Sequence, residues 1–235
     1  MQWSFPYGVL TPASWMSLNA VRYMHQSGAT NEDFGRAVVQ FRSYAARNPN
    51  AHFYERPITL EDHQASRWIA EPAIRLFDCC QETDGGVALV VTTTERARDL
   101  KQTPAVVLGA AQGVGRDPGS PGRAFAMAGL GPQDLDAAMI YDAFSPHLYM
   151  GLEALGICKE GDAKDFVASG AIARGGSLPV NTNGGLIGEA YLHGMNLITE
   201  AVRQVRGTAV NQVEDAEVVS MSSGTNVCIL GRDRS

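Results

Sequence analysis

The sequence predicts an α/β domain in which helices pack in layers against a sheet. Hydrophobic residues make up 45% of the 235 residues and charged residues 19%, which is enough apolar material for a substantial core. Residues 1–84 carry helical patterns joined by irregular links. From residue 85 onward, short apolar runs alternate with helical segments, and this alternation is typical of layered α/β proteins.

Three helices are expected in the N-terminal part of the chain. The first spans 12–28, because it starts with a proline and stops at a glycine. The second spans 30–48, with a threonine N-cap, an acidic first turn and apolar residues at helical spacing. A third, shorter helix opens at Thr59 and carries Trp68 and Ile69.

The period of the apolar pattern changes after Asp84-Gly85-Gly86. Val87–Val91 is a continuous apolar run, which suits a strand buried on both faces. The elements expected after it are helix 94–100, strand 104–110, helix 121–129, strand 137–141, helix 146–156, a long helix 187–206, and strands 216–221 and 226–231. We expect the last two strands to form an antiparallel hairpin.

Composition excludes several classes of protein. The formal net charge is -6, so the chain lacks the basic footprint of a nucleic-acid binder or a polybasic membrane binder. It has no eighteen-residue apolar run and no signal-peptide pattern at its N-terminus, which favours a cytoplasmic protein. Cys79 and Cys80 are adjacent and the other two cysteines are isolated, so we expect neither a metal site nor a disulfide framework.

Three loops carry more polar and glycine residues than a structural turn requires. Tyr141–His147 follows a predicted strand, and ligands bind at the carboxyl ends of strands in open α/β sheets. Asn181–Gly185 leads into Gly188–Gly194, where glycines let the backbone approach a ligand closely. Ser220–Gly224 is the third loop. Each of these patterns alone is more common in purely structural turns, and only the three together indicate a site.

Several segments resemble the branch of the thiolase superfamily that is related to sterol carrier protein X thiolase. They are Asn48-Pro49-Asn50-Ala51, Arg67-Trp68-Ile69-Ala70-Glu71-Pro72 and Leu76-Phe77-Asp78-Cys79-Cys80. The resemblance implies a thiolase-like layered fold.

The resemblance also divides the chain into three parts. Residues 1–84 are then a helical cap and loop region, 85–103 the last strand and helix of an incomplete N-terminal half, and 104–235 the C-terminal half. The rest of the first half is expected to lie outside this chain, and a second chain could supply it.

Three departures from thiolases are informative. Tyr141 and Tyr191 stand where the family has histidines, and Ser220 stands where it has an acid/base cysteine. Claisen chemistry needs a nucleophile and a base of near-neutral pKa, which these residues supply poorly. The paired tyrosines resemble the lipid-transfer-protein-named steroid side-chain aldolases, which keep the thiolase fold.

This second resemblance implies retro-aldol cleavage of a β-hydroxy acyl-CoA. The expected substrate is a steroid side-chain CoA thioester, and the products are a ketone and a short acyl-CoA. We assign Tyr191 as the base and Tyr141 as the acid on the enolate side, although the sequence leaves the two roles interchangeable. His193, Asp142 and Ser220 are expected to support them.

Further expectations concern the substrate and the partners. The residues expected to bind the thioester or CoA are Asn183, Gly184, Gly185, Ser222 and Gly224. No cofactor is expected apart from the coenzyme A of the substrate. The resemblance implies a partner with an OB-fold and a zinc ribbon, and a homodimer or larger complex. Two alternatives stay open: a thiolase-like acyltransferase whose cysteine lies outside this chain, and a non-catalytic subunit that binds acyl-CoA.

Overall fold

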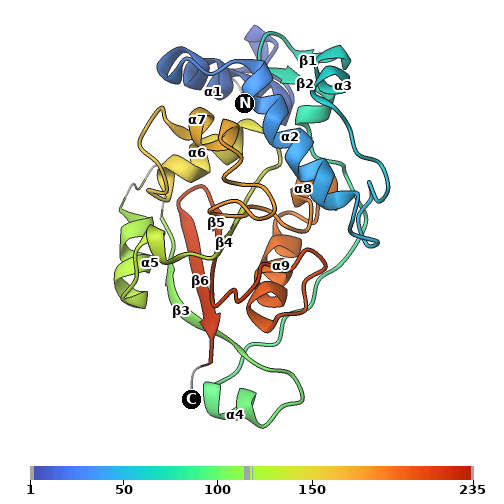
Figure 1. Cartoon of the computed structure of the whole chain (residues 1–235). Helices are drawn as coiled ribbons and strands as arrows, with labels where there is room; N and C mark the ends of the chain where they lie inside the picture. Colours follow the sequence, from blue (N-terminus) through green and yellow to red (C-terminus); the bar gives the residue numbers. More distant parts are fainter. Residues whose placement is uncertain (1–2, 114–116, 118, 234–235) are drawn as a thin grey trace.

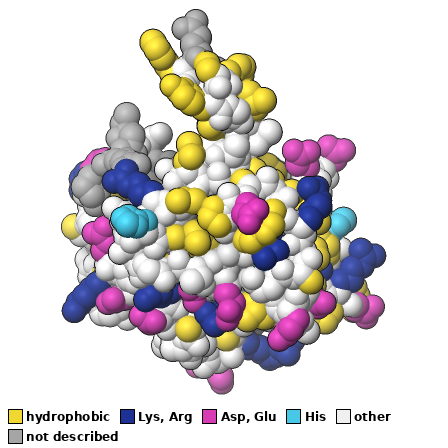
Figure 2. Space-filling view, turned by 90° about the horizontal axis from the view of Figure 1, so that it is seen from above, with side chains coloured by type: hydrophobic (Ala, Val, Ile, Leu, Met, Phe, Trp, Pro, Cys, Tyr) yellow, Lys and Arg dark blue, Asp and Glu magenta, His cyan; other side chains and the backbone are white. Residues whose placement is uncertain are grey.

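The computed structural model describes residues 3–113, 117 and 119–233. Within these residues, a four-stranded mixed sheet stands below a helical region, and Figure 1 shows the two parts one above the other. No described helix combines the length and the apolar character that crossing a membrane requires. Charged side chains of both signs are interspersed on the face seen in Figure 2, in keeping with the small net charge of -6.

The strands of this sheet follow the order β3-β6-β5-β4. They are β3 (Ala105–Ala111), β4 (Ala137–Ile140), β5 (Val218–Ser223) and β6 (Asn226–Arg232). β4 and β5 are parallel, whereas β5–β6 and β6–β3 are antiparallel. The four strands and the C-terminal hairpin were expected from the sequence, and the structure confirms them within one or two residues at most ends.

Helices cover both faces of the sheet (Figure 1). α5 (Ser120–Ala128) and α6 (Pro146–Ala154) share a core with Val218 and Ile229 on one face. α9 (Met195–Arg206) packs on the other face, against side chains such as Met139 and Val219. Alternate residues of each strand therefore enter different cores, as the period of a β-strand requires.

The helical region contains α1 (Pro12–Ser27), α2 (Asn31–Ala45) and α3 (Leu60–Ala65), each of which begins with a threonine capping box. The prediction that the third helix carries Trp68 and Ile69 is wrong. The helix ends at Ala65, and Trp68–Ala70 forms β1, which pairs with β2 (Ile74–Arg75). The guanidinium of Arg75 lies 3.7 Å from the ring centroid of Trp68, so cross-strand stacking stabilises the hairpin.

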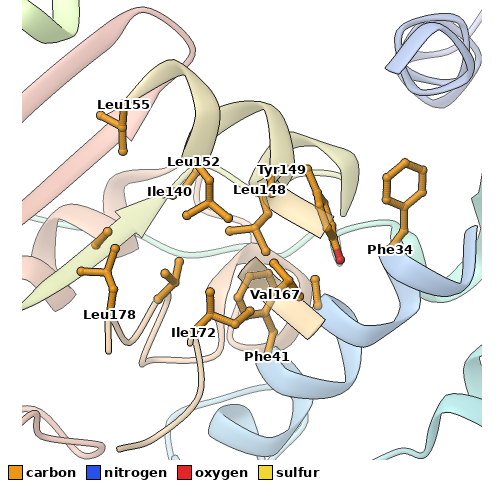
Figure 3. Close-up of a cluster of buried hydrophobic side chains, with 14 of the residues drawn as sticks. Phe34, Phe41, Ile140, Leu148, Tyr149, Leu152, Leu155, Val167, Ile172 and Leu178 are labelled. Carbon is orange, nitrogen blue, oxygen red and sulfur yellow. The ribbon is translucent and has the colours of Figure 1, made fainter. Parts of the chain in front are cut away.

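The helical region and the sheet layer share one hydrophobic core. Phe34 and Phe41 of α2 point toward Leu148 and Tyr149 of α6, as Figure 3 shows. All four side chains are fully buried, and burying a side chain of this size contributes about 1.5–3 kcal/mol. The helical region is thus packed firmly enough to hold the loops beneath it.

The remaining short elements lie mainly in the connections. They are the 3₁₀ turns η1 (Phe5–Tyr7), η2 (Leu76–Asp78) and η3 (Pro132–Asp134), and the helices α4 (Thr94–Arg98), α7 (Ala163–Ala168) and α8 (Gly185–Gly188). The sequence predicted α4 but not α7, which lies in a stretch that we expected to be irregular.

Two other expectations are corrected by the structure. Val87–Val91 forms no strand and runs as an exposed thread between the helical region and α4 (Figure 1), with Val90 86% and Val91 88% exposed. A strand needs a neighbour for its backbone groups, and no described strand pairs with this stretch. The long helix 187–206 is divided into α8, which ends at Gly188, and α9, which begins at Met195, and His193 and Gly194 take left-handed backbone angles just before α9.

Candidate active site

Three polar side chains form a hydrogen-bonded chain where β4 ends and α9 begins. The hydroxyl oxygens of Tyr141 and Tyr191 are 3.0 Å apart, and the Tyr191 hydroxyl lies 2.8 Å from Nδ1 of His193. Tyr141 continues the sheet edge, since its N–H donates to the carbonyl of Ser222. Two segments fifty residues apart in the sequence therefore meet through their side chains.

The break between α8 and α9 allows this meeting. His193 has φ +53°, a strained angle for a residue with a side chain, and Gly194 has φ +87°. A Cβ at position 194 would lie 3.1 Å from a ring carbon of Tyr141. Glycine therefore lets the backbone pass directly beside the tyrosine ring, and the strained turn places His193 within reach of Tyr191.

Partial burial shifts the pKa of two neighbouring rings, Tyr141 and His147. The pKa of Tyr141 lies well above its usual value, first because the phenol is desolvated and second because of its hydrogen bond with Tyr191. Burial lowers the pKa of His147 to about 4, so its ring is neutral at pH 7. The ring centroids of His147 and Tyr141 are 5.7 Å apart. Tyr141 is thus a phenol that keeps its proton in a neutral aromatic surrounding.

A cleft of about 770 Å³ opens beside the pair. Tyr191 and His193 line it, whereas Tyr141 lies behind them. The segment Glu82–Val87 also lines the cleft and includes the carboxylates of Glu82 and Asp84. A substrate in this cleft would meet the hydroxyl of Tyr191 before that of Tyr141.

Asp142 lies next to Tyr141 but points away from the cleft. Its carboxylate is fully buried and accepts hydrogen bonds from the backbone N–H groups of Leu186 (2.8 Å) and Ile187 (3.5 Å). It thereby joins the end of β4 to α8. Gly185 leaves room for it, because a Cβ there would lie 2.1 Å from Oδ2 of Asp142.

Asn183 and Gly184 are also buried and do not line the cleft. The side-chain amide of Asn183 donates to the carboxylate of Glu189, which also accepts from Asn48 and Asn196. Gly184 packs so closely on α2 that a Cβ there would meet the Cβ of Ala45 at 2.7 Å. The structure therefore places these residues in the frame under the site.

Glu189 was missed by the sequence reasoning, although its position beside two glycine-rich turns was visible there. It is only 6% exposed, and a carboxylate without a cationic partner is rarely buried unless several donors reach it.

The third predicted loop contacts Tyr141 through the carbonyl of Ser222, but the side chains of Ser220 and Ser222 point away from the tyrosines. Ser220 lies between Val219 and Met221 on β5, and these two neighbours face the tyrosine side of the sheet. The side chain of Ser220 therefore points to the opposite face, where its buried hydroxyl has no hydrogen-bond partner among the described residues. Ser222 shares that face and Gly224 forms the hairpin turn with φ +58°.

No group of three or more metal-ligating side chains is found among the residues that the structure describes.

Asp142 and His147 predict a specific pH dependence of stability. Burial raises the pKa of Asp142 to about 7 from 3.8, so the folded state holds an extra proton between these values and stability falls as pH rises. The lowered pKa of His147 has the opposite effect between about 4 and 6.5, where the unfolded state holds the extra proton. In the native protein the two effects largely cancel.

Asp142→Asn should remove one side of this balance. Between pH 4 and pH 7, the change in the free energy of unfolding of the variant should then be more positive than that of the native protein by roughly 3–4 kcal/mol. Urea unfolding at several pH values measures this difference. Parallel pH profiles for the two proteins would show that Asp142 does not titrate in this range.

The comparisons with known proteins agree with this architecture. Residues 92–229 match the family described as thiolase C-terminal domain-like. The fold also resembles human mitochondrial 3-ketoacyl-CoA thiolase, with a TM-score of 0.67 over 94% of this chain and 60% of that chain at 17% identity.

Two curated relatives are more similar in sequence than this thiolase and align with almost the whole chain. A steroid side-chain-cleaving aldolase of Thermomonospora curvata is 54% identical over 99% of this chain and 65% of its own length. The 17-hydroxy-3-oxo-4-pregnene-20-carboxyl-CoA lyase of Mycobacterium tuberculosis is 53% identical over 95% of this chain and 62% of its own length.

A solved structure described as the Ltp2-ChsH2(DUF35) aldolase superposes with a TM-score of 0.96 at 52% identity, over 100% of this chain and 67% of that chain. The chain thus spans a little under two thirds of the two curated relatives. Because the family match extends over more than half of its residues, the chain belongs to the thiolase C-terminal domain-like family.

Proposed function

We propose that this chain carries the catalytic tyrosines of a thiolase-fold aldolase, a carbon–carbon lyase that acts on a β-hydroxy acyl-CoA. The observation that supports the proposal most is the hydrogen-bonded chain of Tyr141, Tyr191 and His193 at the edge of a cleft. The names of the two relatives above 50% identity support the same reaction class. They also favour a steroid side-chain CoA thioester as the substrate.

The geometry suits a retro-aldol cleavage. The substrate hydroxyl gives its proton to Tyr191 while the Tyr191 hydroxyl passes its own proton to Nδ1 of His193. The electrons of the O–H bond form the ketone carbonyl, the carbon–carbon bond breaks, and its electrons move onto the thioester as an enolate. Tyr141, whose pKa is raised, keeps its proton to stabilise the enolate oxygen and then to protonate the carbon. The proton held by His193 then returns through Tyr191 to the Tyr141 phenolate, along the 2.8 Å and 3.0 Å contacts, and restores all three groups. This assignment makes Tyr191 the base and Tyr141 the acid.

The raised pKa values of the cysteine thiols argue against acyl transfer to a cysteine among the described residues. Burial raises the pKa of Cys79, Cys80 and Cys158 to about 12, and it raises the pKa of Cys228 as well. A thiol acts as a nucleophile in its thiolate form, which is scarce at such pKa values. We therefore expect iodoacetamide at pH 7.5 to leave the cleavage rate unchanged. Inactivation that follows alkylation of one of these cysteines would favour an acyltransferase instead.

The direct experiment incubates the protein with a β-hydroxy acyl-CoA whose hydroxyl is tertiary, and measures the ketone and the shorter acyl-CoA by mass spectrometry. Parallel reactions with free CoA test for thiolysis. Thiolysis without retro-aldol cleavage would support the acyltransferase, and binding of the acyl-CoA without turnover would support a non-catalytic subunit. No cofactor is added, since the proposed steps consist of proton transfers and one carbon–carbon bond cleavage whose electrons the thioester accepts.

We also propose that the protein works in the cytoplasm with a second component that carries an OB-fold and a zinc ribbon, as a homodimer or a larger complex. The description of the solved relative, which names Ltp2 together with ChsH2(DUF35), supports a two-component assembly for that protein. Co-purification from native extract tests the proposal here, and a chain that elutes alone would contradict it.

A further inference from the structure

A fully buried carboxylate, Asp78, lies outside the tyrosine chain and collects four donors. Oδ1 accepts from Nε2 of His63 (2.9 Å) and from the hydroxyl of Ser145. Oδ2 accepts from the side-chain amide of Asn31 (3.0 Å) and from the backbone N–H of Arg75 (2.7 Å). Asp78 and His63 are both 0% exposed, and buried polar groups of this kind are costly unless all of them are paired.

The network also indicates which ring nitrogen of His63 carries the proton. The side-chain amide of Gln64 lies 3.1 Å from Nδ1 of His63 and donates to it, so the ring proton is on Nε2 and points at Asp78. Asn31 belongs to α2 and His63 to α3. One carboxylate therefore fastens the helical region to the segment that begins at residue 78.

That segment, residues 78–83, runs beside the loop that carries Tyr141. The carbonyl of Asp78 accepts from the N–H of Ser145 (3.0 Å), and the N–H of Cys80 donates to the carbonyl of Ala143 (2.9 Å). Ser145 occupies the N-cap position of α6 but makes no side-chain capping bond. Its hydroxyl donates to the carboxylate of Asp78 instead, so Ser145 makes a tertiary contact in place of the usual helix cap.

The same segment then reaches the second tyrosine. The N–H of Tyr191 lies 3.2 Å from the carbonyl of Gln81 and 3.4 Å from the hydroxyl of Thr83, and Glu82 pairs with Tyr191 as a parallel bridge. The two tyrosines thus approach each other from loops that are both hydrogen-bonded to residues 78–83. Their hydroxyl oxygens are 3.0 Å apart.

We propose that residues 78–83 form a positioning segment that sets the register of Tyr141 against Tyr191, and that Asp78 is its anchor in the helical region. The effect on catalysis rests on the proposed function, whereas the effect on the placement of the two tyrosines is independent of it. Asp78 and Ser145 are positioning residues in this scheme, since neither lines the cleft.

Ser145→Ala tests the arm of the network that leads to the tyrosine loop, and Gln64→Ala is its matched control on the arm that leads to the helical region. Two quantities are measured: kinetics with the acyl-CoA, and the ¹⁵N resonance of His193 Nδ1 in histidine-labelled protein. The resonance reports the hydrogen bond from Tyr191, and Tyr191→Phe supplies its value without that bond.

Ser145→Ala should lower kcat by about 10- to 100-fold, because small displacements of reacting groups have effects of this order. Its KM should stay within about twofold of the native value, and the His193 resonance should move toward that of Tyr191→Phe. Gln64→Ala should lower stability and move both readouts much less than Ser145→Ala does, because Gln64 reaches Asp78 only through His63 and Asn31.

Thr83→Val removes the contact at the other end of the segment without touching the buried network, and it should move the His193 resonance in the same direction even if Ser145→Ala does not fold. A native resonance in every folded variant at residues 145 and 83 would overturn the inference. So would an equal shift in Gln64→Ala. If the native protein cleaves no substrate, the proposed function fails while the resonance still decides the positioning role.

Discussion

Tyr191→Phe and Tyr141→Phe should each reduce the rate of carbon–carbon cleavage by about 10²- to 10⁴-fold, the usual contribution of a general acid or base. Phenylalanine keeps the ring and its packing but removes the hydroxyl that stands in the 3.0 Å contact between the two residues. Product formation under saturating acyl-CoA measures the effect on kcat. Near-native rates in both variants would exclude the proposed mechanism.

The two variants should also differ from each other. Tyr191 lines the cleft and contacts His193, so its loss removes the proton path from the substrate hydroxyl. Tyr141 is the half-buried donor, so its loss should slow protonation of the enolate carbon. Incubation of added acyl-CoA product with each variant in D₂O probes that proton transfer in reverse, and exchange of deuterium into its α-carbon should fall in Tyr141→Phe but persist in Tyr191→Phe. The reverse pattern would exchange the two roles.

A matched variant separates the hydroxyl chemistry from packing. Tyr54→Phe removes the hydroxyl of a tyrosine that is 41% exposed and does not line the cleft. Its cleavage rate should match that of the native protein, because a partly exposed hydroxyl outside the site takes no part in the proposed proton transfers.

Gly185→Ala should destabilise the fold by roughly 3–5 kcal/mol. The residue has φ +67°, where a side chain costs about 1–2 kcal/mol, and its Cβ would lie 2.1 Å from the Asp142 carboxylate. That oxygen belongs to a carboxylate held by backbone N–H groups of α8, so it cannot move without losing those bonds. Overpacking of this kind adds further cost.

Gly207→Ala is the control for this prediction. Gly207 has a similar φ of +72° but nothing within 4 Å of its Cβ position, so only the backbone strain should remain, about 1–2 kcal/mol. Urea unfolding of both variants gives the two costs. Equal losses of stability would mean that the contact between Gly185 and Asp142 carries no weight.

Local signals in the sequence were sufficient to predict most of the helices and strands. The helix α1 follows from its proline start and glycine stop, and α2 from its threonine cap, acidic first turn and asparagine stop, all of which act over a few residues. The strands β4, β5 and β6 follow from apolar runs of the right length. These signals are read from the chain itself and need no information about distant partners.

The secondary-structure predictions were wrong where contacts with residues distant in the sequence determine the local structure. Val87–Val91 has strand composition, yet it forms no ladder with the described strands. Trp68 fits a helical pattern, but pairing with Arg75 makes it part of a hairpin. The helix expected over 187–206 is broken at His193 and Gly194, and this break is what allows His193 to contact Tyr191.

The candidate site divides in the same way. The sequence by itself determined that the chain carries Tyr141 and Tyr191, and its resemblance to thiolases predicted that they stand in place of two histidines, which indicated the chemistry to consider. Only the tertiary structure decided that these tyrosines meet with His193, while Asn183, Gly184 and Gly185 lie in the frame below and Ser220 faces the other side of the sheet. The physical reason is that residue type sets what a side chain can do, whereas its direction and burial depend on strand register and on backbone angles that only packed neighbours specify.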